Sequence, residues 1–373
     1  MNNILVTGGA GFIGSHLVDQ LIRLGYQVRI LDNLDPQVHG KEQKIPDYLN
    51  QNADLIIGDV RDSALVKTCL TDIDYVVHLA AAVGVGQSAY MIQHYVDVNI
   101  TGTAVLLQEI SKLNNKIQKI FVASSMSIYG EGLYQCKQHG ELKPIGRDHS
   151  NLASKQWELI CPHCNSILTP IPTPESKTCY SSSIYAITKR VQEELFLSTG
   201  ATYNIPTIAL RFFNVWGSRQ ALSNPYTGVA AIFCSRILNN SAPIVYEDGE
   251  QIRDFVHVSD VVQAIILTLK NDSLKSDVFN VGSGEKITVN EIADLLNKAI
   301  GSNNKAQTTN EYRVGDIRHC FADISSIQNE TGYKPRKFLN ENIDELVSWV
   351  IQQKSDDTFF QAKKELEKRG LVL

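Results

Sequence analysis

Two residues of this chain, Tyr185 and Lys189, have the types and the spacing for proton transfer beside a bound cofactor. A free tyrosine has a pKa of about 10 and is a poor base at neutral pH, but a nearby ammonium group favours its phenolate form. Residues four apart share one face of a helix, so Lys189 can reach the region of Tyr185. The Tyr-x-x-x-Lys spacing is common by chance, so its meaning depends on the other motifs of the chain.

A glycine-rich segment near the N-terminus predicts a dinucleotide site. The spacing of Gly9, Gly11 and Gly14 is G-x-G-x-x-G, and Gly8 adds a wider G-x-x-G-x-x-G spacing. Glycines permit a tight turn and let backbone N–H groups approach a pyrophosphate at the N-terminus of the next helix. The loop residues expected to contact the cofactor are Gly8, Gly11, Phe12, Ile13 and Gly14. Together with the tyrosine and lysine, this loop indicates redox chemistry on a nicotinamide.

Acidic residues after the next two predicted strands complete this cofactor site. Asp32 lies 18 residues after Gly14, where a carboxylate can accept a hydrogen bond from a ribose 2′-hydroxyl. Asn33 follows it, and no arginine is placed to bind a 2′-phosphate, so NAD is favoured over NADP. Asp59 could bind the adenine amino group, although a helix-capping loop would also explain it.

The elements that position these residues follow an alternating pattern. Short apolar runs alternate with amphipathic segments, which predicts an α/β fold with a doubly wound, Rossmann-type parallel sheet. The predicted strands are Asn3–Val6, Val28–Leu31, Leu55–Ile57, Tyr75–His78, Lys119–Ala123 and Thr207–Leu210. We expect an NAD-binding domain over residues 1–215 and a smaller α+β substrate lobe mainly over 216–373, with interleaved segments. A charged helix over 358–369 has no assigned role.

The composition is that of an ordinary soluble globular protein, with 43% hydrophobic and 20% charged residues. A net charge of −5 gives no reason to expect a nucleic acid partner. No apolar run approaches the roughly 18–20 residues that span a membrane. Seven cysteines, an odd number, argue against a complete disulfide framework, and a cytoplasmic location is expected.

A polar, cysteine-rich insertion over residues 131–182 predicts a metal site. Its two short motifs, Cys136-x-x-His139 and Cys161-x-x-Cys164, are separated by 21 residues and have the form of a Cys₃His zinc site. The insertion looks too polar to build its own core, so a structural zinc would supply its folding energy. Free surface thiols and a redox pair are the alternatives. A catalytic zinc is disfavoured, because four protein ligands leave no open position.

With a serine-rich segment, Ser124–Gly130, at the end of the fifth strand, the chain resembles an extended short-chain dehydrogenase/reductase of the NAD-dependent epimerase/dehydratase family. The matching motifs run from Thr7 to about Arg318. The resemblance implies a catalytic triad of Ser125, Tyr185 and Lys189. Further cofactor contacts implied by it are Asp32, Asn33, Asp59, Val60, Leu79, Ala80, Ala81 and Asn99. Implied substrate contacts are Ser125, Ser127, Asn214, Arg253 and Arg313, with both arginines binding phosphate.

The residues after Ser125 indicate which reaction of this family is expected. Dehydratases carry an Asp-Glu pair there, decarboxylases a Glu and 3,5-epimerases a Cys, whereas this chain has Met126 and Ser127. Methionine cannot transfer protons, and a serine hydroxyl is a poor unaided base. What remains is 4-epimerisation of a nucleotide diphosphate sugar with tightly bound NAD, or simple reduction of a 4-keto sugar.

The insertion and a second segment, residues 220–229, resemble a subgroup of dTDP-L-rhamnose 4-epimerases. By analogy with the family, a homodimer is expected through the helices predicted over 98–113 and 186–198. A third hypothesis, from another class, is a non-catalytic protein that senses NAD. The intact serine, tyrosine and lysine set argues against it, because a sensor needs neither a phenol nor an ammonium group.

Overall fold

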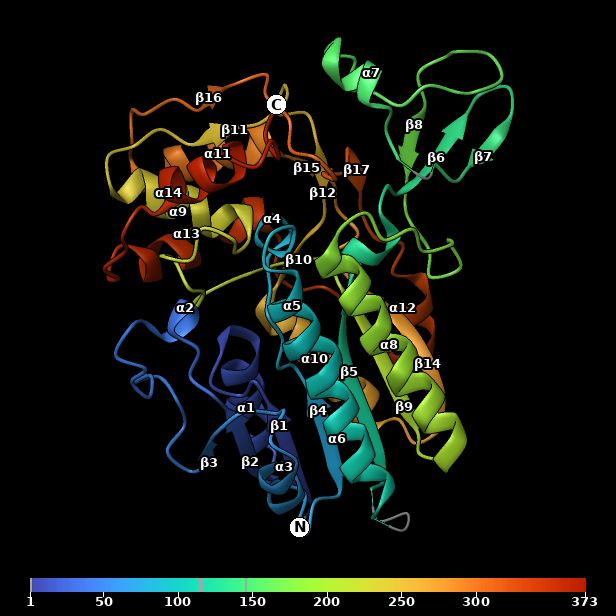
Figure 1. Cartoon of the computed structure of the whole chain (residues 1–373), viewed down its shortest axis with the longest axis vertical. Coiled ribbons are helices and arrows are strands. Elements are labelled where there is room, and N and C mark those ends of the chain that lie inside the picture. Colours follow the sequence, from blue (N-terminus) through green and yellow to red (C-terminus); the bar gives the residue numbers. More distant parts are fainter. Residues whose placement is uncertain (1, 114–116, 145) are drawn as a thin grey trace.

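A seven-stranded parallel sheet forms the centre of the molecule in the computed structural model, which describes residues 2–113, 117–144 and 146–373. The strand order is β14-β9-β5-β4-β1-β2-β3 (Figure 1). The strands are β1 (Asn3–Thr7), β2 (Gln27–Asp32), β3 (Asp54–Ile57), β4 (Tyr75–His78), β5 (Lys119–Ser125), β9 (Thr207–Phe212) and β14 (Ser276–Val281). The six predicted strands and the α/β class are confirmed. The order reverses between β1 and β4, and ligands of such sheets bind at that point, beyond the carboxyl ends of the strands.

The sheet is apolar on both faces because helices cover both. Along β1, Ile4 and Val6 pack into one core cluster while Leu5 packs into another. The helices of the first face are α1 (Phe12–Arg23) and α10 (Val258–Lys270), and those of the second face are α3 (Ser63–Cys69), α6 (Gly102–Ser111) and α8 (Ile184–Tyr203). A π-helical turn, η1 (Val96–Thr101), precedes α6, where the sequence predicted one continuous helix.

A second lobe packs above the carboxyl ends of the strands, at the upper left of Figure 1. Its helices α9 (Val229–Leu238), α11 (Val289–Ile300) and α13 (Leu339–Val350) share a third apolar core. The short strands of this part are β10 (Asn214–Trp216), β11 (Ile244–Val245), β12 (Ile252–Arg253), β13 (Phe255–His257), β15 (Ile287–Thr288), β16 (Gln307–Thr308) and β17 (His319–Cys320). The other helices are α2 (Pro36–His39), α4 (Val85–Ser88), α5 (Ile92–Tyr95), η2 (Met126–Tyr129), α12 (Ser325–Thr331) and α14 (Phe359–Glu367). The domain boundary itself stays a prediction.

The insertion forms a small antiparallel sheet of its own, at the upper right of Figure 1. Its elements are β6 (Leu133–Cys136), β7 (Gly140–Leu142), β8 (Thr169–Ile171) and α7 (His149–Ala153). Five buried residues pack together in it: Tyr134, Cys136, Leu159, Cys161 and Leu168. The expectation that the insertion is too polar to build a core was therefore wrong, because a small core is present and two candidate zinc ligands belong to it.

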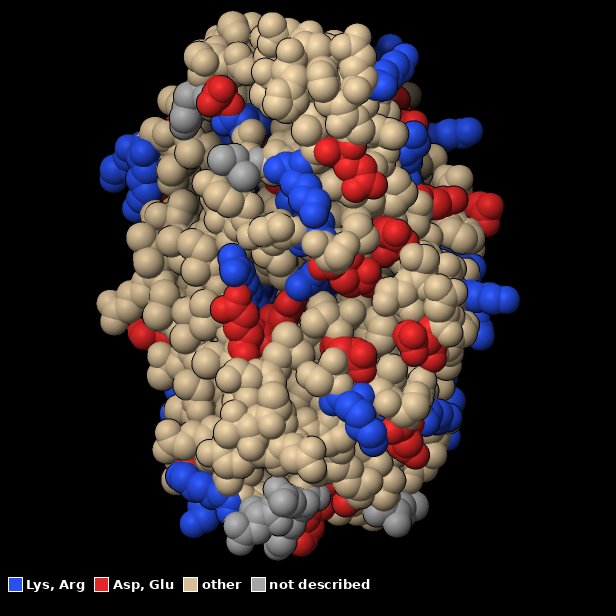
Figure 2. All heavy atoms as spheres, turned by 90° about the vertical axis from the view of Figure 1, so that its right-hand side faces the viewer, with Lys and Arg blue, Asp and Glu red and all other residues tan. Residues whose placement is uncertain are grey.

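Charged side chains on the face shown in Figure 2 mix both signs and form no basic patch. Among the described residues, no helix is both long enough and apolar enough to cross a membrane.

Candidate active site

At Gly8 and Gly14 the turn from β1 into α1 is packed so tightly that a side chain would not fit. Gly8 has φ +71°, and a Cβ built on Gly14 would lie 2.2 Å from the Gly8 carbonyl oxygen. This turn starts α1 at Gly11, which offers no side-chain cap to the helix. The first N–H groups of α1 therefore suit an anionic ligand such as a pyrophosphate.

Asp32 ends β2 with its carboxylate fixed against this loop. Its Oδ2 accepts a hydrogen bond from the Ala10 N–H at 3.0 Å, and its Oδ1 accepts one from the Leu34 N–H at 2.9 Å. A carboxylate can accept further bonds, so a ribose hydroxyl remains compatible with this position. Both Asp32 and Asn33 line the cavity described below.

Asp59 forms an ion pair with Arg61, which the sequence did not suggest. Both of its oxygens accept hydrogen bonds from the Arg61 guanidinium, at 2.8 and 2.7 Å. These hydrogen bonds from Arg61 lower the pKa of Asp59. An adenine amino group would have to share this carboxylate with Arg61, although Asp59 and Val60 both line the cavity.

Asn99 supports the cofactor site from behind instead of lining it. It is fully buried, and its Oδ1 accepts a hydrogen bond from the Ala82 N–H at 2.7 Å. Its Nδ2 donates to the Ala82 carbonyl at 3.1 Å and to Thr188 Oγ1 at 2.9 Å. Asn99 thus ties the chain after β4 to α8. The cavity wall at this strand end consists of Leu79, Ala80, Ala81 and Ala82.

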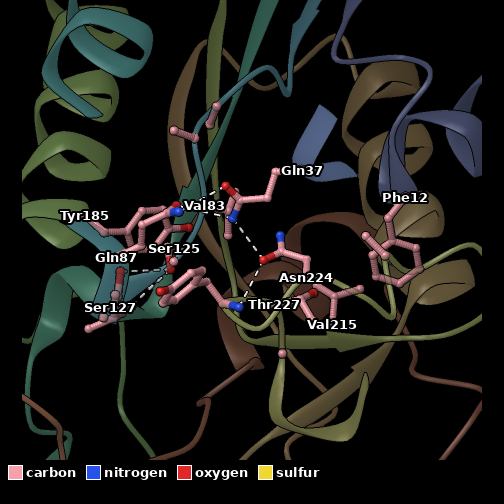
Figure 3. Close-up of a pocket in the computed structure, with 18 of the residues that line it drawn as sticks. Phe12, Gln37, Val83, Gln87, Ser125, Ser127, Tyr185, Val215, Asn224 and Thr227 are labelled. Atoms are coloured by element: carbon pink, nitrogen blue, oxygen red, sulfur yellow. Dashed lines mark hydrogen bonds between the residues drawn. The ribbon is translucent and has the colours of Figure 1, made fainter. Parts of the chain in front are cut away.

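Tyr185 and Lys189 lie in the first two turns of α8, which Ser183 starts. The Ser183 hydroxyl accepts a hydrogen bond from the Ala186 N–H at 3.1 Å, as expected of an N-cap. The Tyr185 N–H donates to Ser88 Oγ on α4 at 3.0 Å. These two bonds fix where the phenol enters the cavity, beside Ser125 at the end of β5 (Figure 3).

Burial shifts the pKa values of both Tyr185 and Lys189 toward their neutral forms, although Lys189 stays partly charged at neutral pH. Burial raises the pKa of Tyr185 to about 12, and a hydrogen bond with Ser125 opposes this shift. Burial lowers the pKa of Lys189 to about 7, and Glu193 opposes this shift. A phenolate at neutral pH therefore needs added positive charge, which a bound cationic nicotinamide would supply.

A buried polar relay behind Lys189 was not predicted from the sequence. Lys189 Nζ donates to Gln192 Oε1 at 2.7 Å, and Gln192 Nε2 donates to Thr103 Oγ1 at 2.8 Å. Gln192 Nε2 also lies 3.2 Å from His78 Nε2, and His78 Nδ1 lies 2.7 Å from Thr7 Oγ1. Burial, with Lys189 close by, lowers the pKa of His78 to about 3. The relay fixes the position of the Lys189 side chain, and burial keeps His78 neutral.

On the substrate side, Asn214 has an unused hydrogen-bond acceptor. It lines the cavity from β10, and its buried Oδ1 has no hydrogen-bond partner in the structure. Buried polar atoms are rarely left unpaired, so a ligand donor would fit here.

The two candidate phosphate arginines converge on one carboxylate. Arg313 donates to Asp316 Oδ2 at 2.7 Å, and Arg253 Nη2 lies 3.9 Å from Asp316 Oδ1. Arg253 also donates to the carbonyls of Ile317 and Arg318, each at 2.8 Å. Burial would raise the pKa of Asp316, but the Arg313 and Arg253 cations lower it on balance. A phosphate would therefore enter a site with two cations and one anion.

One continuous cavity of about 610 Å³ joins these parts. It runs from the glycine loop past Ser125, Ser127 and Tyr185 to Arg253 and Arg313. A chain of amides crosses it (Figure 3): Gln87 Nε2 donates to Gln37 Oε1 at 3.1 Å, and Gln37 Nε2 donates to Asn224 Oδ1 at 2.9 Å. No sequence motif indicated this network, which links the segment after β2 to the second lobe.

The four predicted metal ligands also come together, far from this cavity. Cys136 Sγ lies 3.4 Å from His139 Nδ1 and 3.6 Å from Cys164 Sγ, and Cys161 Sγ lies 3.4 Å from His139 Nδ1. All four ligand atoms lie within 4.8 Å of one another.

Comparison with known proteins shows the family to which the chain belongs. Residues 5–146 match the family model described as GDP-mannose 4,6 dehydratase, and residues 164–282 match that of the NAD dependent epimerase/dehydratase family. A dTDP-L-rhamnose 4-epimerase of Burkholderia thailandensis is 33% identical over 94% of this chain and 95% of its own. The chain belongs to the NAD-dependent epimerase/dehydratase family. The resemblance inferred from its motifs is confirmed.

Solved structures of this epimerase/dehydratase family agree with the fold. A UDP-N-acetylglucosamine 4-epimerase of Methanobrevibacter ruminantium, in complex with UDP-N-acetylmuramic acid, matches with a TM-score of 0.76 at 33% identity, over 95% of this chain and 99% of its own. A UDP-glucose 4-epimerase of Thermus thermophilus in complex with NAD matches with a TM-score of 0.74 at 27% identity, over 94% and 100%. NAD binding, expected from the glycine loop, is therefore supported by both the cradle and the family.

Proposed function

We propose that this chain is a nucleotide-sugar 4-epimerase that uses tightly bound NAD, with a dTDP-6-deoxyhexose such as dTDP-L-rhamnose as substrate. One observation carries the choice of reaction. Met126 and Ser127 stand where dehydratases of the family have their acid–base pair, and both line the cavity beside Tyr185. Tyr185 is thus left to move the substrate proton, which suffices for chemistry at one carbon. The match to a dehydratase family model reflects the shared fold and does not decide the reaction.

In the proposed mechanism, NAD held by the glycine loop and Asp32 would supply the acceptor for the hydride of the sugar C4 and its later donor. The Tyr185 phenolate removes the proton of the C4 hydroxyl, so that the C–O bond gains double-bond character as the C4–H bond breaks. Ser125 donates a hydrogen bond to the same oxygen, and the Lys189 ammonium holds the phenol deprotonated. The 4-keto sugar turns about its pyrophosphate linkage while Arg253, Arg313 and Asn214 hold the nucleotide. The hydride would then return to the opposite face of C4, and Tyr185 returns the proton to the C4 oxygen.

The decisive experiment uses purified protein and dTDP-L-rhamnose without added cofactor, followed by NMR of the sugar. Appearance of the C4 epimer would support the proposal. The main alternative, a 4-ketoreductase with exchangeable cofactor, predicts steady consumption of NADH or NADPH with a 4-keto sugar and no reaction without added cofactor. A non-catalytic NAD sensor predicts neither.

We also propose that Cys136, His139, Cys161 and Cys164 bind a structural zinc. Tetrahedral zinc with Zn–S of about 2.3 Å and Zn–N of about 2.0–2.1 Å requires ligand atoms roughly 3.5–3.8 Å apart. The distances of 3.4 and 3.6 Å in the cluster fit this geometry. Mass spectrometry of the purified protein should find one zinc per chain, lost in Cys161→Ser and kept in the control Cys179→Ser. Metal-free protein in which the thiols of Cys136, Cys161 and Cys164 are all reactive would contradict the assignment.

We further propose a homodimer through η1, α6 and α8, whose helices α6 and α8 pack against each other. Light scattering should then give about twice the chain mass of 41.5 kDa. A mass of one chain would refute it. A cytoplasmic location stays a prediction from the cysteine count.

A further inference from the structure

The C-terminal segment, residues 356–373, has no role in the proposed mechanism, yet it is attached to both substrate-side loops. At its start, the Asp356 N–H donates to Ser223 Oγ at 3.0 Å, and Thr358 Oγ1 donates to the Ser223 carbonyl at 2.8 Å. At its end, the Leu373 and Tyr312 backbones exchange two hydrogen bonds, of 2.8 and 3.0 Å. The segment thus spans from the 220–228 loop to the loop that carries Arg313.

Between these attachments, one face of α14 forms part of the cavity wall. Phe359, Ala362, Lys363 and Leu366 line the cavity, and their spacing places them on one side of the helix. Leu366 reaches α4, because a Cβ on Gly86 would lie 3.5 Å from Leu366 Cδ1. Lys364, next to Lys363 in the sequence, is exposed on the other side. The helix therefore closes the substrate half of the cavity from outside.

Lys363 brings a fixed cation to this wall. Its side chain is only 15% exposed, and its Nζ lies 2.6 Å from Glu311 Oε2 and 3.6 Å from Glu367 Oε1. An ammonium group has three donors, so these two carboxylates leave one for a ligand. Glu311 precedes the Arg313 segment by two residues, which ties the position of Lys363 to that of the arginine.

The surroundings of Lys363 suit a flat ring. Tyr246 lies beside it, with the Arg313 guanidinium 5.0 Å above the ring centre. Ile244, Tyr246 and Phe359 all line the cavity in this part of the molecule. An aromatic or apolar slot next to a phosphate-binding arginine is a setting in which a nucleobase can bind.

We propose that α14 is one wall of the nucleotide subsite and that Lys363 donates a hydrogen bond to the 4-carbonyl oxygen of a pyrimidine base. The inference rests on the proposed function, since it assumes that the substrate is a nucleotide sugar held by Arg313. A lysine donor selects a base that presents a carbonyl at this edge, such as thymine or uracil. Cytosine has an amino group in place of the 4-carbonyl, so at this position it presents a donor to the ammonium where uracil presents an acceptor. Lys363 is thereby a specificity-determining residue outside the catalytic group.

The test compares dUDP with dCDP, which have the same sugar and phosphates and differ at the pyrimidine edge. Calorimetry on the NAD-containing protein should show dUDP binding more tightly than dCDP. In Lys363→Ala, affinity for dUDP should fall about tenfold while that for dCDP changes less than about twofold, because a hydrogen bond to a charged group is lost only for dUDP. The matched control Lys364→Ala should keep both affinities, and NAD content should be unchanged in both variants.

An unchanged ratio of dUDP to dCDP affinity in Lys363→Ala would overturn the assignment of Lys363. A second variant tests the wall itself: Ala362→Leu adds bulk toward the cavity and should weaken both nucleotides alike without loss of NAD. Unchanged binding in Ala362→Leu would overturn the wall. The proposed function and the role of Lys363 can fail separately. If the protein epimerises dTDP-L-rhamnose but Lys363→Ala keeps the wild-type ratio of dUDP to dCDP affinity, only the role of Lys363 is refuted. A wild-type protein that binds neither nucleotide refutes both.

Discussion

Replacing Gly14 with alanine should destroy the cofactor cradle. A Cβ on Gly14 would lie 2.2 Å from the Gly8 carbonyl oxygen, whereas ordinary contact begins at 3.4 Å, so the loop would have to open by about 1.2 Å. It has little freedom to do so, because Gly8 itself lies against the chain after β4. A Cβ on Gly8 would be 2.8 Å from the Ala80 nitrogen.

Overpacking of this kind costs about 1–3 kcal/mol of folding free energy. A matched control lies three residues away in the same loop. A Cβ on Gly11 would be 3.4 Å from the Gly8 carbonyl oxygen, and the φ of Gly11 is −74°, which alanine adopts without strain. Gly11→Ala should therefore change the stability of the NAD-free protein by no more than about 0.5 kcal/mol.

The assay is urea unfolding of the three proteins after removal of bound NAD, since NAD would itself stabilise the folded state. Chromatography of the NAD released from each untreated protein gives its cofactor content. Gly14→Ala should unfold at lower urea and carry little NAD. Gly14→Ala with wild-type stability and a full complement of NAD would refute the cradle argument.

Three further predictions follow from the site and from the insertion. Tyr185→Phe should abolish epimerisation, by at least about 10²-fold for loss of the proton-transfer group, yet keep NAD bound; retained turnover would refute its role. His78 has a pKa of about 3 in the fold and 6.5 when free, so the unfolded chain binds the extra proton between these values. Unfolding free energy should therefore fall as pH drops below 6.5, by up to about 1.4 kcal/mol per pH unit from this residue, and more gently in His78→Gln. Arg318, 1% exposed, pairs with Glu158 of the insertion at 2.5 Å, with Glu247 at 3.1 Å and with Asp248 at 2.6 Å. Arg318→Met should lower the free energy of unfolding in urea by about 3–5 kcal/mol, because three carboxylates lose their cation. A decrease below about 1 kcal/mol would show that Arg318 does not stabilise these carboxylates.

The strands and the glycine loop could be predicted because local patterns of residue type mark them. The strands of the sheet are short apolar runs bounded by loops, and the glycine loop follows the first of them directly. The exception is β14, whose residues 276–281 begin with a serine and an aspartate and mix polar with apolar groups without a regular alternation. Such a run is ambiguous by itself. It is fixed as a strand by its pairing with β9.

Long-range packing explains what the sequence missed. Gln192 meets His78 from 114 residues away, and Gln37 meets Asn224 from 187 residues away. Amide side chains have no spacing that marks them as functional, so these networks appear only when the chain folds. Asn99 is a case in which the motif was recognised but the contact was not. Its amide is buried and forms hydrogen bonds with the Ala82 backbone, whereas the motif implied a contact with the cofactor.

The fate of the hydrogen at C4 distinguishes a self-contained hydride transfer from other reactions of the sugar. Purified protein is given dTDP-L-rhamnose deuterated at C4, in ordinary water and without added cofactor, and the sugar is followed by NMR and mass spectrometry. The C4 epimer should form with its deuterium retained at C4, because the same hydride leaves and returns while Tyr185 moves only the hydroxyl proton. Loss of the deuterium to water, or an unchanged sugar, would contradict epimerisation of this substrate by a self-contained hydride transfer.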